Sequence, residues 1–203
     1  RGERVPQVIA ITSALPAEGK TTTALAFARM LAMNGSKTLL IECDVRRAVM
    51  QEHVRNRPSV PGLIEVLDGD ATSEQAIFPG DVDNLSQLFV NKPFFDSSNL
   101  FGDGRMEALL SKLRPHYDQI VLDLPPLVGL ADSRFLAALA DIAVLVVRWS
   151  KTPVTAANTA LEWLRGDGVK VAGVMLTMID PGAEAAGAYY YSKKYSGYYQ
   201  SDR

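Results

Sequence analysis

The sequence has little sulfur and imidazole chemistry, since its 203 residues include one Cys and two His. One Cys excludes an internal disulfide and a Cys-rich metal site, and it is typical of proteins from a reducing compartment. No apolar run approaches the ~20 residues that a membrane-spanning helix needs, and no signal peptide is present. Because the chain begins with Arg1-Gly2 and not with Met, we expect a segment of a longer protein, whose other part could contain membrane spans.

An excess of positive charge is also absent, because the formal net charge is −2 and the pI is about 5.7. Binding to nucleic acid through its phosphates needs a basic surface that releases counterions, so nucleic acid is not an expected partner. Hydrophobic residues make up 47% and charged residues 22% of the chain. This composition is typical of a soluble globular protein, and the length suits one α/β domain with a substantial core.

What the sequence does contain is a strand, loop and helix near its start. An apolar, β-branched run at residues 8–12 precedes Ala-Leu-Pro-Ala-Glu-Gly-Lys-Thr at residues 14–21, and a helical pattern covers residues 22–33. Gly-Lys-Thr in this context predicts a phosphate-binding loop, because a helix N-terminus offers backbone N–H groups and the positive end of a dipole. The alternative is an ordinary helix start that happens to contain Gly-Lys-Thr.

Each of the three residues Gly19, Lys20 and Thr21 has a chemical property that suits a nucleotide phosphate or its metal ion. Gly19 lets the backbone approach an anion, Lys20 supplies a point charge for the β- and γ-phosphates, and Thr21 offers a hydroxyl to Mg²⁺. The general pattern begins with Gly, and Ala14 can replace that Gly only if its φ angle stays negative. The residues expected to contact the nucleotide are Pro16, Ala17, Glu18, Gly19, Lys20, Thr21 and Thr22.

Acidic residues follow the second predicted strand, residues 38–41. Asp44 lies just beyond the carboxyl end of this strand, where ligands of open α/β sheets bind, so we expect it to face Mg²⁺ or an incoming nucleophile. Glu42 shares that face of the strand, whereas Cys43 points to the opposite side and is expected in the core. For Arg46 and Arg47 two interpretations stay open, contact with phosphates or a solvated surface.

A further carboxylate ends the strand predicted within residues 117–123. Asp123 is the second metal-side group that a phosphate loop requires, so we expect it to hold Mg²⁺ through water and to orient the γ-phosphate. Pro125-Pro126 follows at once and prevents regular ladder pairing, so the chain is predicted to turn away after the acid.

Helical and strand patterns alternate along the rest of the chain. Helices are expected over residues 63–67, 106–113, 133–140 (capped by Asp132) and 155–165, and strands over residues 85–90, 142–148 and 171–177. This alternation predicts an α/β fold with a doubly wound, mostly parallel sheet and helices on both faces. No Gly-x-Gly-x-x-Gly follows the first strand, which excludes a dinucleotide-dependent oxidoreductase.

The end of the chain differs in composition. Aliphatic residues are scarce beyond Asp180, and six of the seven Tyr crowd there, namely Tyr189, Tyr190, Tyr191, Tyr195, Tyr198 and Tyr199. Because termini of this kind are usually mobile, we expect a domain over residues 1–180 and a flexible Tyr-rich tail over residues 181–203. Composition leaves three interpretations of the Tyr cluster: phosphoacceptors, an aromatic patch for a partner, or a membrane-interface anchor.

Together these motifs resemble the bacterial tyrosine autokinases (BY-kinases) that regulate capsule and exopolysaccharide synthesis. Residues 12–21 are similar to the phosphate loop of that family, residues 39–47 to its second acidic motif and residues 118–126 to its third. The terminal Tyr cluster fits as well, so the resemblance covers nearly the whole chain. It implies the fold of a P-loop NTPase of the MinD/ParA type.

Three positions depart from the family pattern. Ala17 replaces a Gly in the phosphate loop, and Glu42 replaces the first of two Asp in the second motif. Thr177 stands where the family usually carries Asn after the last strand.

The resemblance implies an ATP- and Mg²⁺-dependent kinase that phosphorylates Tyr residues of its own C-terminal cluster in trans. The catalytic residues would be Lys20, Asp44, Glu42 and Asp123, and the metal would be organised by Thr21, Asp44 and Asp123. Asp44, or Glu42, would accept a hydrogen bond from the incoming Tyr hydroxyl.

The resemblance also implies partners and a location. It predicts a ring-like homo-oligomer that presents the Tyr tail of one subunit to the active site of its neighbour. It further predicts a membrane-spanning polysaccharide co-polymerase or activator, fused or separate, and a cognate tyrosine phosphatase. The kinase domain would lie at the cytoplasmic face of the bacterial inner membrane.

Two other functions are consistent with the same fold. A partitioning or site-placement ATPase usually carries an additional Lys early in the phosphate loop, and Leu15 at that position disfavours it. A nucleotide-gated scaffold with little kinase activity stays open because Glu42 replaces Asp.

Overall fold

Seven strands form one sheet among the residues that the computed structural model describes, which are 5–54, 58–95 and 100–180. The strands are β1 (Val8–Ser13), β2 (Thr38–Glu42), β3 (Phe78–Pro79), β4 (Leu85–Leu88), β5 (Gln119–Asp123), β6 (Ile142–Arg148) and β7 (Val171–Thr177). Their order across the sheet is β3-β4-β2-β5-β1-β6-β7, and every neighbouring pair is parallel except β3 with β4. The predicted doubly wound, mostly parallel α/β fold is confirmed.

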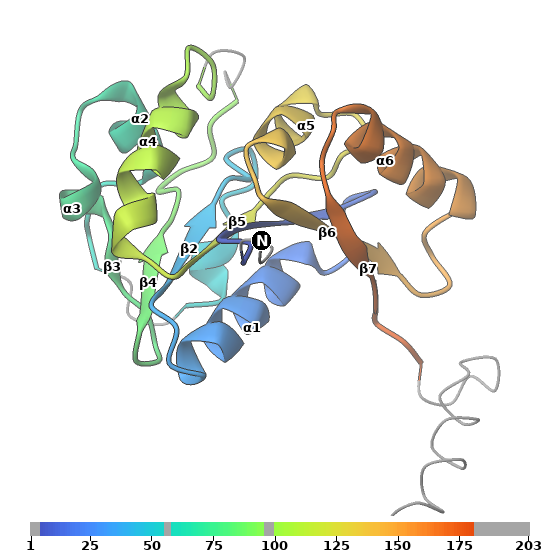
Figure 1. The fold of residues 1–203 in the computed structure, drawn as a ribbon, viewed down its shortest axis with the longest axis horizontal. Coiled ribbons are helices and arrows are strands. Elements are labelled where there is room, and N and C mark those ends of the chain that lie inside the picture. The colour runs from blue at the N-terminus through green and yellow to red at the C-terminus, as the bar shows by residue number, and fades with distance from the viewer. Residues whose placement is uncertain (1–4, 55–57, 96–99, 181–203) are drawn as a thin grey trace, which may run out of the picture.

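Helices cover both faces of this sheet (Figure 1). One face is covered by α1 (Lys20–Met33), whose small residues Ala24 and Ala28 pack in one core cluster with Ile9 and Ile11 of β1. A second core cluster fills the opposite face and joins the strands to the other longer helices. These helices are α2 (Leu63–Asp68), α4 (Arg105–Leu113), α5 (Ala131–Ala138) and α6 (Val154–Gly166). The shorter elements are α3 (Ser73–Ala76), η1 (Met50–Glu52) and η3 (Arg114–His116).

The central strands are buried along their whole length, which explains their continuous apolar runs. Every residue of β1 and β2 is buried. Cys43, just beyond β2, is fully buried as predicted, and burial raises the pKa of its thiol well above the usual value. A neutral, inaccessible thiol behaves as a small apolar side chain, so Cys43 is a core residue.

Two details differ from the sequence-based prediction. Asp132 does not cap α5, because the helix begins at Ala131 with Leu130 in the N-cap position, and Asp132 lies in the first turn and pairs with Arg46. The antiparallel strand β3 was not predicted, since its two residues are too short for a periodic signal. Thr72 caps α3, because its hydroxyl accepts a hydrogen bond from the N–H of Gln75.

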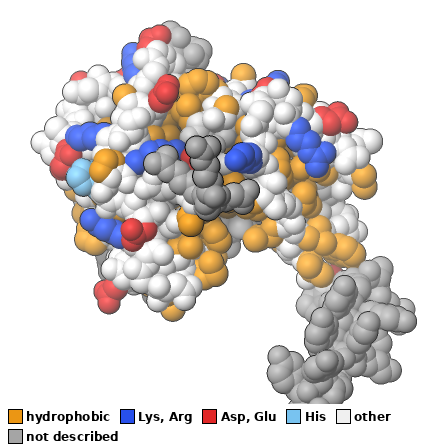
Figure 2. All heavy atoms as spheres, viewed as in Figure 1, with side chains coloured by type: hydrophobic (Ala, Val, Ile, Leu, Met, Phe, Trp, Pro, Cys, Tyr) orange, Lys and Arg blue, Asp and Glu red, His pale blue; other side chains and the backbone are white. Residues whose placement is uncertain are grey.

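The edge strand β7 exposes apolar side chains on both of its faces. Figure 2 shows hydrophobic side chains gathered over β7 on the side in view. Val174 is 51% exposed, and Met175, Leu176, Met178 and Ile179 are exposed between 41% and 55%. None of the helices in the described part of the chain is both long enough and apolar enough to cross a bilayer.

Backbone strain gathers at the carboxyl edge of the sheet. Six non-glycine residues have positive φ angles in the described part of the chain, and four of them follow β1, β2, β6 and β7 at this edge. These four are Ala17 (φ 62°), Ala48 (46°), Ser150 (53°) and Met178 (51°). Left-handed conformations of this kind cluster at functional sites, so the strain indicates a functional site at this edge.

A polar cluster closes the opposite, amino edge. Asp141 accepts hydrogen bonds from the N–H groups of Gln7 and Val8 at 2.8 and 2.7 Å, and the guanidinium of Arg114 binds it with two nitrogens at 3.0 and 2.9 Å. Partial burial opposes ionisation, but Arg114 and the two N–H groups lower the pKa of Asp141 to about 2. The cluster ties the start of β1 to the residue before β6 and to the start of η3.

We expect Asp141→Asn to destabilise the protein by about 1 kcal/mol at pH 7, a value discounted for the partial exposure of the pair. A carboxyl group whose pKa is depressed on folding stabilises the native state above its unfolded pKa of about 3.9, and that contribution is lost as pH falls toward 2. The free energy of unfolding in urea should therefore fall less steeply between pH 4 and 2 for the variant than for the wild type. The exposed Asp83, replaced by Asn, serves as the control and should follow the wild type.

We expect Ala17→Gly to stabilise the protein by about 0.5–1 kcal/mol. Gly removes the left-handed penalty at φ 62° but gains freedom in the unfolded chain, which offsets part of the effect. The matched control is Ala108→Gly on the exposed side of α4, where helical backbone makes the same change cost about 1 kcal/mol. Urea unfolding at pH 7 should show a higher free energy of unfolding for Ala17→Gly and a lower one for Ala108→Gly. A change in the same direction for both variants would contradict the strain at Ala17.

Candidate functional site

The predicted phosphate loop joins β1 to α1. The helix begins two residues earlier than expected, so Lys20 and Thr21 are its first residues and both are buried. Gly19 is the N-cap residue with a φ angle of 86°, a conformation that other residue types adopt only with strain. Ala14 is absent from the positive φ angles of the described chain, which meets the condition set for a replaced Gly. The loop therefore ends at a helix N-terminus, which is a ready anion-binding position.

Lys20 lies between the carboxylates at the ends of two other strands. Its ammonium is 2.9 Å from Oδ2 of Asp44 and 3.2 Å from Oδ1 of Asp123. The hydroxyl of Thr21 donates to Oδ2 of Asp123 at 2.8 Å. Residues from the ends of β1, β2 and β5, up to 103 positions apart in sequence, thus meet at a single point. This is the convergence that the three motifs predict.

Burial and charge oppose each other at this point. Burial alone would lower the pKa of Lys20, but the negative charges of Asp123 and Asp44 outweigh it and raise the pKa. Full burial raises the pKa of Asp123, while Lys20 and Thr21 act in the opposite direction. The lysine therefore stays charged, and its charge balances acids that would otherwise be costly to bury.

Glu42 is engaged elsewhere, although it was predicted to share the face of Asp44. Its Oε1 accepts from the N–H of Met50 at 2.8 Å and its Oε2 from the N–H of Val90 at 3.0 Å. Burial raises the pKa of Glu42 to about 7, and those two bonds oppose the shift. The carboxylate joins the end of β2 to η1 and to the segment after β4, and so fixes the loop that carries Asp44.

The segment after Asp123 forms the base of the phosphate loop. The carbonyl of Pro125 accepts from the hydroxyls of Thr12 at 2.8 Å and Ser133 at 2.9 Å. The N–H of Leu127 donates to the carbonyl of Ser13 at 2.8 Å. Sequence reasoning missed Thr12 and Ser133 as supports of this loop, and a hydroxyl residue in a strand or helix gives no signal of its distant partner.

The other predicted residues occupy the rim or lie outside the description. Pro16, Ala17 and Thr22 are exposed, whereas Glu18 is buried and turned into the loop. Arg46 pairs with Asp132 at 3.1 Å, and Arg47 is exposed. The six Tyr of the terminal cluster lie outside the described residues.

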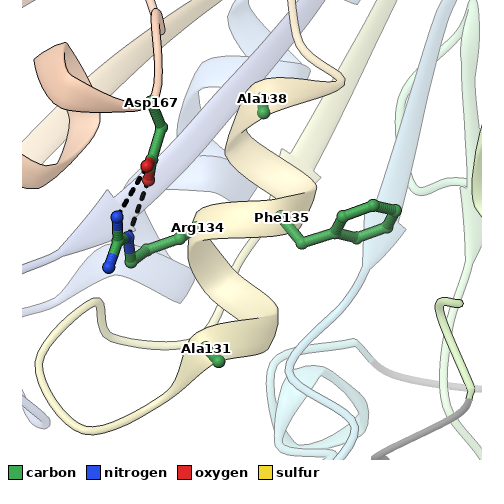
Figure 3. A pocket seen from close by; sticks show the side chains of 5 residues that line it. All are labelled: Ala131, Arg134, Phe135, Ala138 and Asp167. Atoms are coloured by element: carbon green, nitrogen blue, oxygen red, sulfur yellow. Dashed lines mark hydrogen bonds and ion pairs between the residues drawn. The ribbon is translucent and has the colours of Figure 1, made fainter.

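A hollow between α5 and α6 is not part of this site (Figure 3). It has a volume of about 370 Å³ and is lined by Ala131, Arg134, Phe135, Ala138 and Asp167. Its cation, Arg134, is held by Asp167 through two hydrogen bonds of 2.7 and 2.6 Å, and Phe135 points away from that pair. Since the guanidinium is already neutralised, the hollow offers little to a phosphate.

Comparison with known proteins agrees with this geometry. A family model described as an AAA domain matches residues 6–162. The succinoglycan biosynthesis transport protein ExoP of Rhizobium meliloti is 33% identical over 204 residues, which cover 95% of this chain and 25% of that protein. The chain thus spans about a quarter of the length of this relative. The tyrosine-protein kinase YwqD of Bacillus subtilis is 32% identical over 174 residues, covering 86% of this chain and 73% of the kinase.

Solved structures show the same fold. The kinase domain of VpsO matches with a TM-score of 0.80 and 31% identity, covering 86% of both chains. The septum site-determining protein MinD of Pyrococcus horikoshii, complexed with Mg-ADP, matches with a TM-score of 0.72 and 25% identity over 84% of this chain and 69% of that one. The fold is therefore that of the MinD/ParA-like P-loop NTPases. On the AAA-domain match and the similarity to YwqD, the chain belongs to the bacterial tyrosine kinase (BY-kinase) family.

Proposed function

We propose that this chain is an ATP- and Mg²⁺-dependent tyrosine kinase that phosphorylates the C-terminal Tyr cluster of a second copy. The observation that carries the proposal is the position of the Lys20 ammonium, 2.9 Å from Asp44 and 3.2 Å from Asp123 at the start of α1. A cation, two acids and a helix N-terminus at one point are the parts that phosphoryl transfer needs.

The residues fit a magnesium nucleotide. Thr21, Asp44 and Asp123 supply the hard oxygen ligands that Mg²⁺ prefers, and Lys20 and the N–H groups of the loop suit phosphate oxygens. When bound, Mg²⁺-ATP supplies the transferable γ-phosphoryl group and neutralises its developing charge. Thr21 and Asp123 would hold the Mg²⁺ ion, while Lys20 would bind the phosphate oxygens.

Asp44 is the proposed acceptor for the Tyr hydroxyl. Glu42 is less suited, since both of its oxygens already accept backbone N–H groups. A free phenol has a pKa of about 10, so alignment of the hydroxyl matters more than a strong base. Asp44 at the carboxyl end of β2 would orient that hydroxyl and receive its proton.

The acceptors in this proposal are in the segment over residues 181–203, namely Tyr189, Tyr190, Tyr191, Tyr195, Tyr198 and Tyr199. The likeness to YwqD, named a tyrosine-protein kinase, supports this assignment. Of the three interpretations left by composition, we adopt the phosphoacceptor cluster, because it suits a member of a tyrosine kinase family.

The cellular setting is likewise proposed from relatives. ExoP is named a succinoglycan biosynthesis transport protein. We infer that this kinase regulates polymerisation and export of an exopolysaccharide or capsule from the cytoplasmic face of the inner membrane. Its partners would be further copies in a ring, a membrane-spanning co-polymerase and a cognate tyrosine phosphatase.

We expect Lys20→Met to reduce phosphotyrosine formation about 100-fold or more, because a preorganised charge at the phosphates is lost. The control is Lys112→Met on α4, whose ammonium pairs with the exposed Glu74 at 2.8 Å. Purified proteins are incubated with Mg²⁺-ATP, and phosphotyrosine is mapped by intact mass and peptide sequencing. Circular dichroism checks folding, since removing Lys20 leaves two buried acids without their cation.

The outcomes separate the candidate functions. Phosphate persisting on the tail of the Lys20→Met variant would reveal a contaminating kinase and contradict the proposal. ATP hydrolysis without phosphotyrosine, even in the full-length assembly, would favour a MinD-like ATPase. Nucleotide binding without turnover would favour a scaffold.

We expect phosphorylation of the tail to dissociate the ring. Each phosphate adds about −1.5 to −2 charges, and several within one short segment repel one another and the acidic sites on which the tails dock. Light scattering should give a smaller mass for phosphorylated than for phosphatase-treated protein. A variant with all six terminal Tyr changed to Phe should have the same oligomer mass after incubation with ATP and after phosphatase treatment. A wild-type oligomer mass that does not differ between these treatments would contradict the expected dissociation.

A further inference from the structure

A carboxylate inside the phosphate loop needs an explanation. Glu18 is adjacent to Gly19 and two residues before Lys20, yet it is only 3% exposed. An anion at this place would repel a triphosphate unless its charge were engaged elsewhere. Its Oε2 accepts from the N–H of Leu15 at 2.8 Å, which closes the loop on itself.

The other carboxylate oxygen is held by a distant threonine. Oε1 of Glu18 accepts from the hydroxyl of Thr152, in the connection between β6 and α6. The same hydroxyl accepts from the N–H of Arg148 at 2.8 Å. A hydroxyl has one proton, so the bond from Arg148 leaves that proton to Glu18 and fixes its direction.

A second threonine holds the backbone of the same residue. The hydroxyl of Thr177, at the end of β7, donates to the carbonyl of Glu18 at 2.6 Å. The carbonyl of Thr177 accepts in turn from the N–H of Trp149 at 2.9 Å. Side chain and main chain of Glu18 are thus both tied to the ends of β6 and β7.

These contacts sit where the loop is most strained. Ala17 (φ 62°) and Gly19 (φ 86°) flank Glu18, so two of three consecutive residues are left-handed. Such conformations persist only when the surrounding structure imposes them. The bonds to Leu15, Thr152 and Thr177 hold Glu18, the residue between these two left-handed positions.

We propose that Glu18, Thr152 and Thr177 are positioning residues that hold the phosphate loop in its nucleotide-binding shape. The side chain of Glu18 acts through the loop backbone and not by contact with the nucleotide. The hydroxyl of Thr152 keeps its carboxylate turned away from the phosphates, and the hydroxyl of Thr177 holds its main-chain carbonyl. This inference rests on the proposed nucleotide-dependent function. It assigns a role to Thr152, which no motif includes, and to Thr177, which stands at the Asn position of the family.

The test is the affinity for Mg-ADP, measured by calorimetry at 20 °C together with the melting temperature. Thr152→Val removes the hydroxyl at constant shape and should weaken binding about tenfold, the effect of losing a hydrogen bond to a charged group. Thr152→Ser restores the hydroxyl and should bind within about threefold of the wild type. Glu18→Gln should resemble Thr152→Val, and the double variant should be no weaker than either, because both changes break one interaction.

The control is Thr72→Val, which removes the hydroxyl that caps α3. It should lower the melting temperature and leave the affinity for Mg-ADP unchanged. If Thr152→Val also melts earlier but binds like the wild type, the contact is merely structural and the inference is wrong. If Thr152→Val does not fold, Thr177→Val gives an independent measurement. A wild-type affinity of Thr177→Val for Mg-ADP would also contradict the inference. A wild type that binds no Mg-ADP would refute the proposed function as well.

Discussion

A lysine ammonium between two carboxylates, nearly out of reach of water, is the interaction on which the rest of this structure depends. Burying Asp44 and Asp123 is costly, and Lys20 offsets the cost only at hydrogen-bond distance from both. The adjacent positions of β2, β5 and β1 in the sheet make that distance possible. Removing one partner would leave an uncompensated charge in the interior, so the sheet order and the charge triad support each other.

Around the triad, the neighbouring loops are held by backbone donors and by distant side chains. Glu42 fixes the loop of Asp44 through the N–H groups of Met50 and Val90. The carbonyl of Pro125 fixes the turn after Asp123 by accepting from Thr12 and Ser133. A site whose supports are themselves hydrogen-bonded needs little rearrangement when a charged ligand arrives. The strained backbone at this edge is stable because so many contacts determine it.

Local patterns predicted every strand except β3, the longer helices and the meeting of Lys20, Asp44 and Asp123, since each rests on periodicity or on a strand followed by a characteristic residue. The contacts of Thr152 and Thr177 with Glu18 were beyond reach, because they join positions 134 and 159 residues apart. Alternation along β2 placed Glu42 on a face but did not show that its longer side chain would reach Val90. Asp132 had the residue type of a cap, but Arg46 draws it into an ion pair.

The central place of β1 has a consequence for how the chain is made. The strand preceding the phosphate loop pairs with residues 120–123 on one side and 142–146 on the other. During synthesis these partners emerge from the ribosome long after β1, and pairings so far apart in sequence form slowly. Within this domain, the phosphate loop is therefore translated before the strands that flank β1, and β1 is among the last strands to acquire its neighbours.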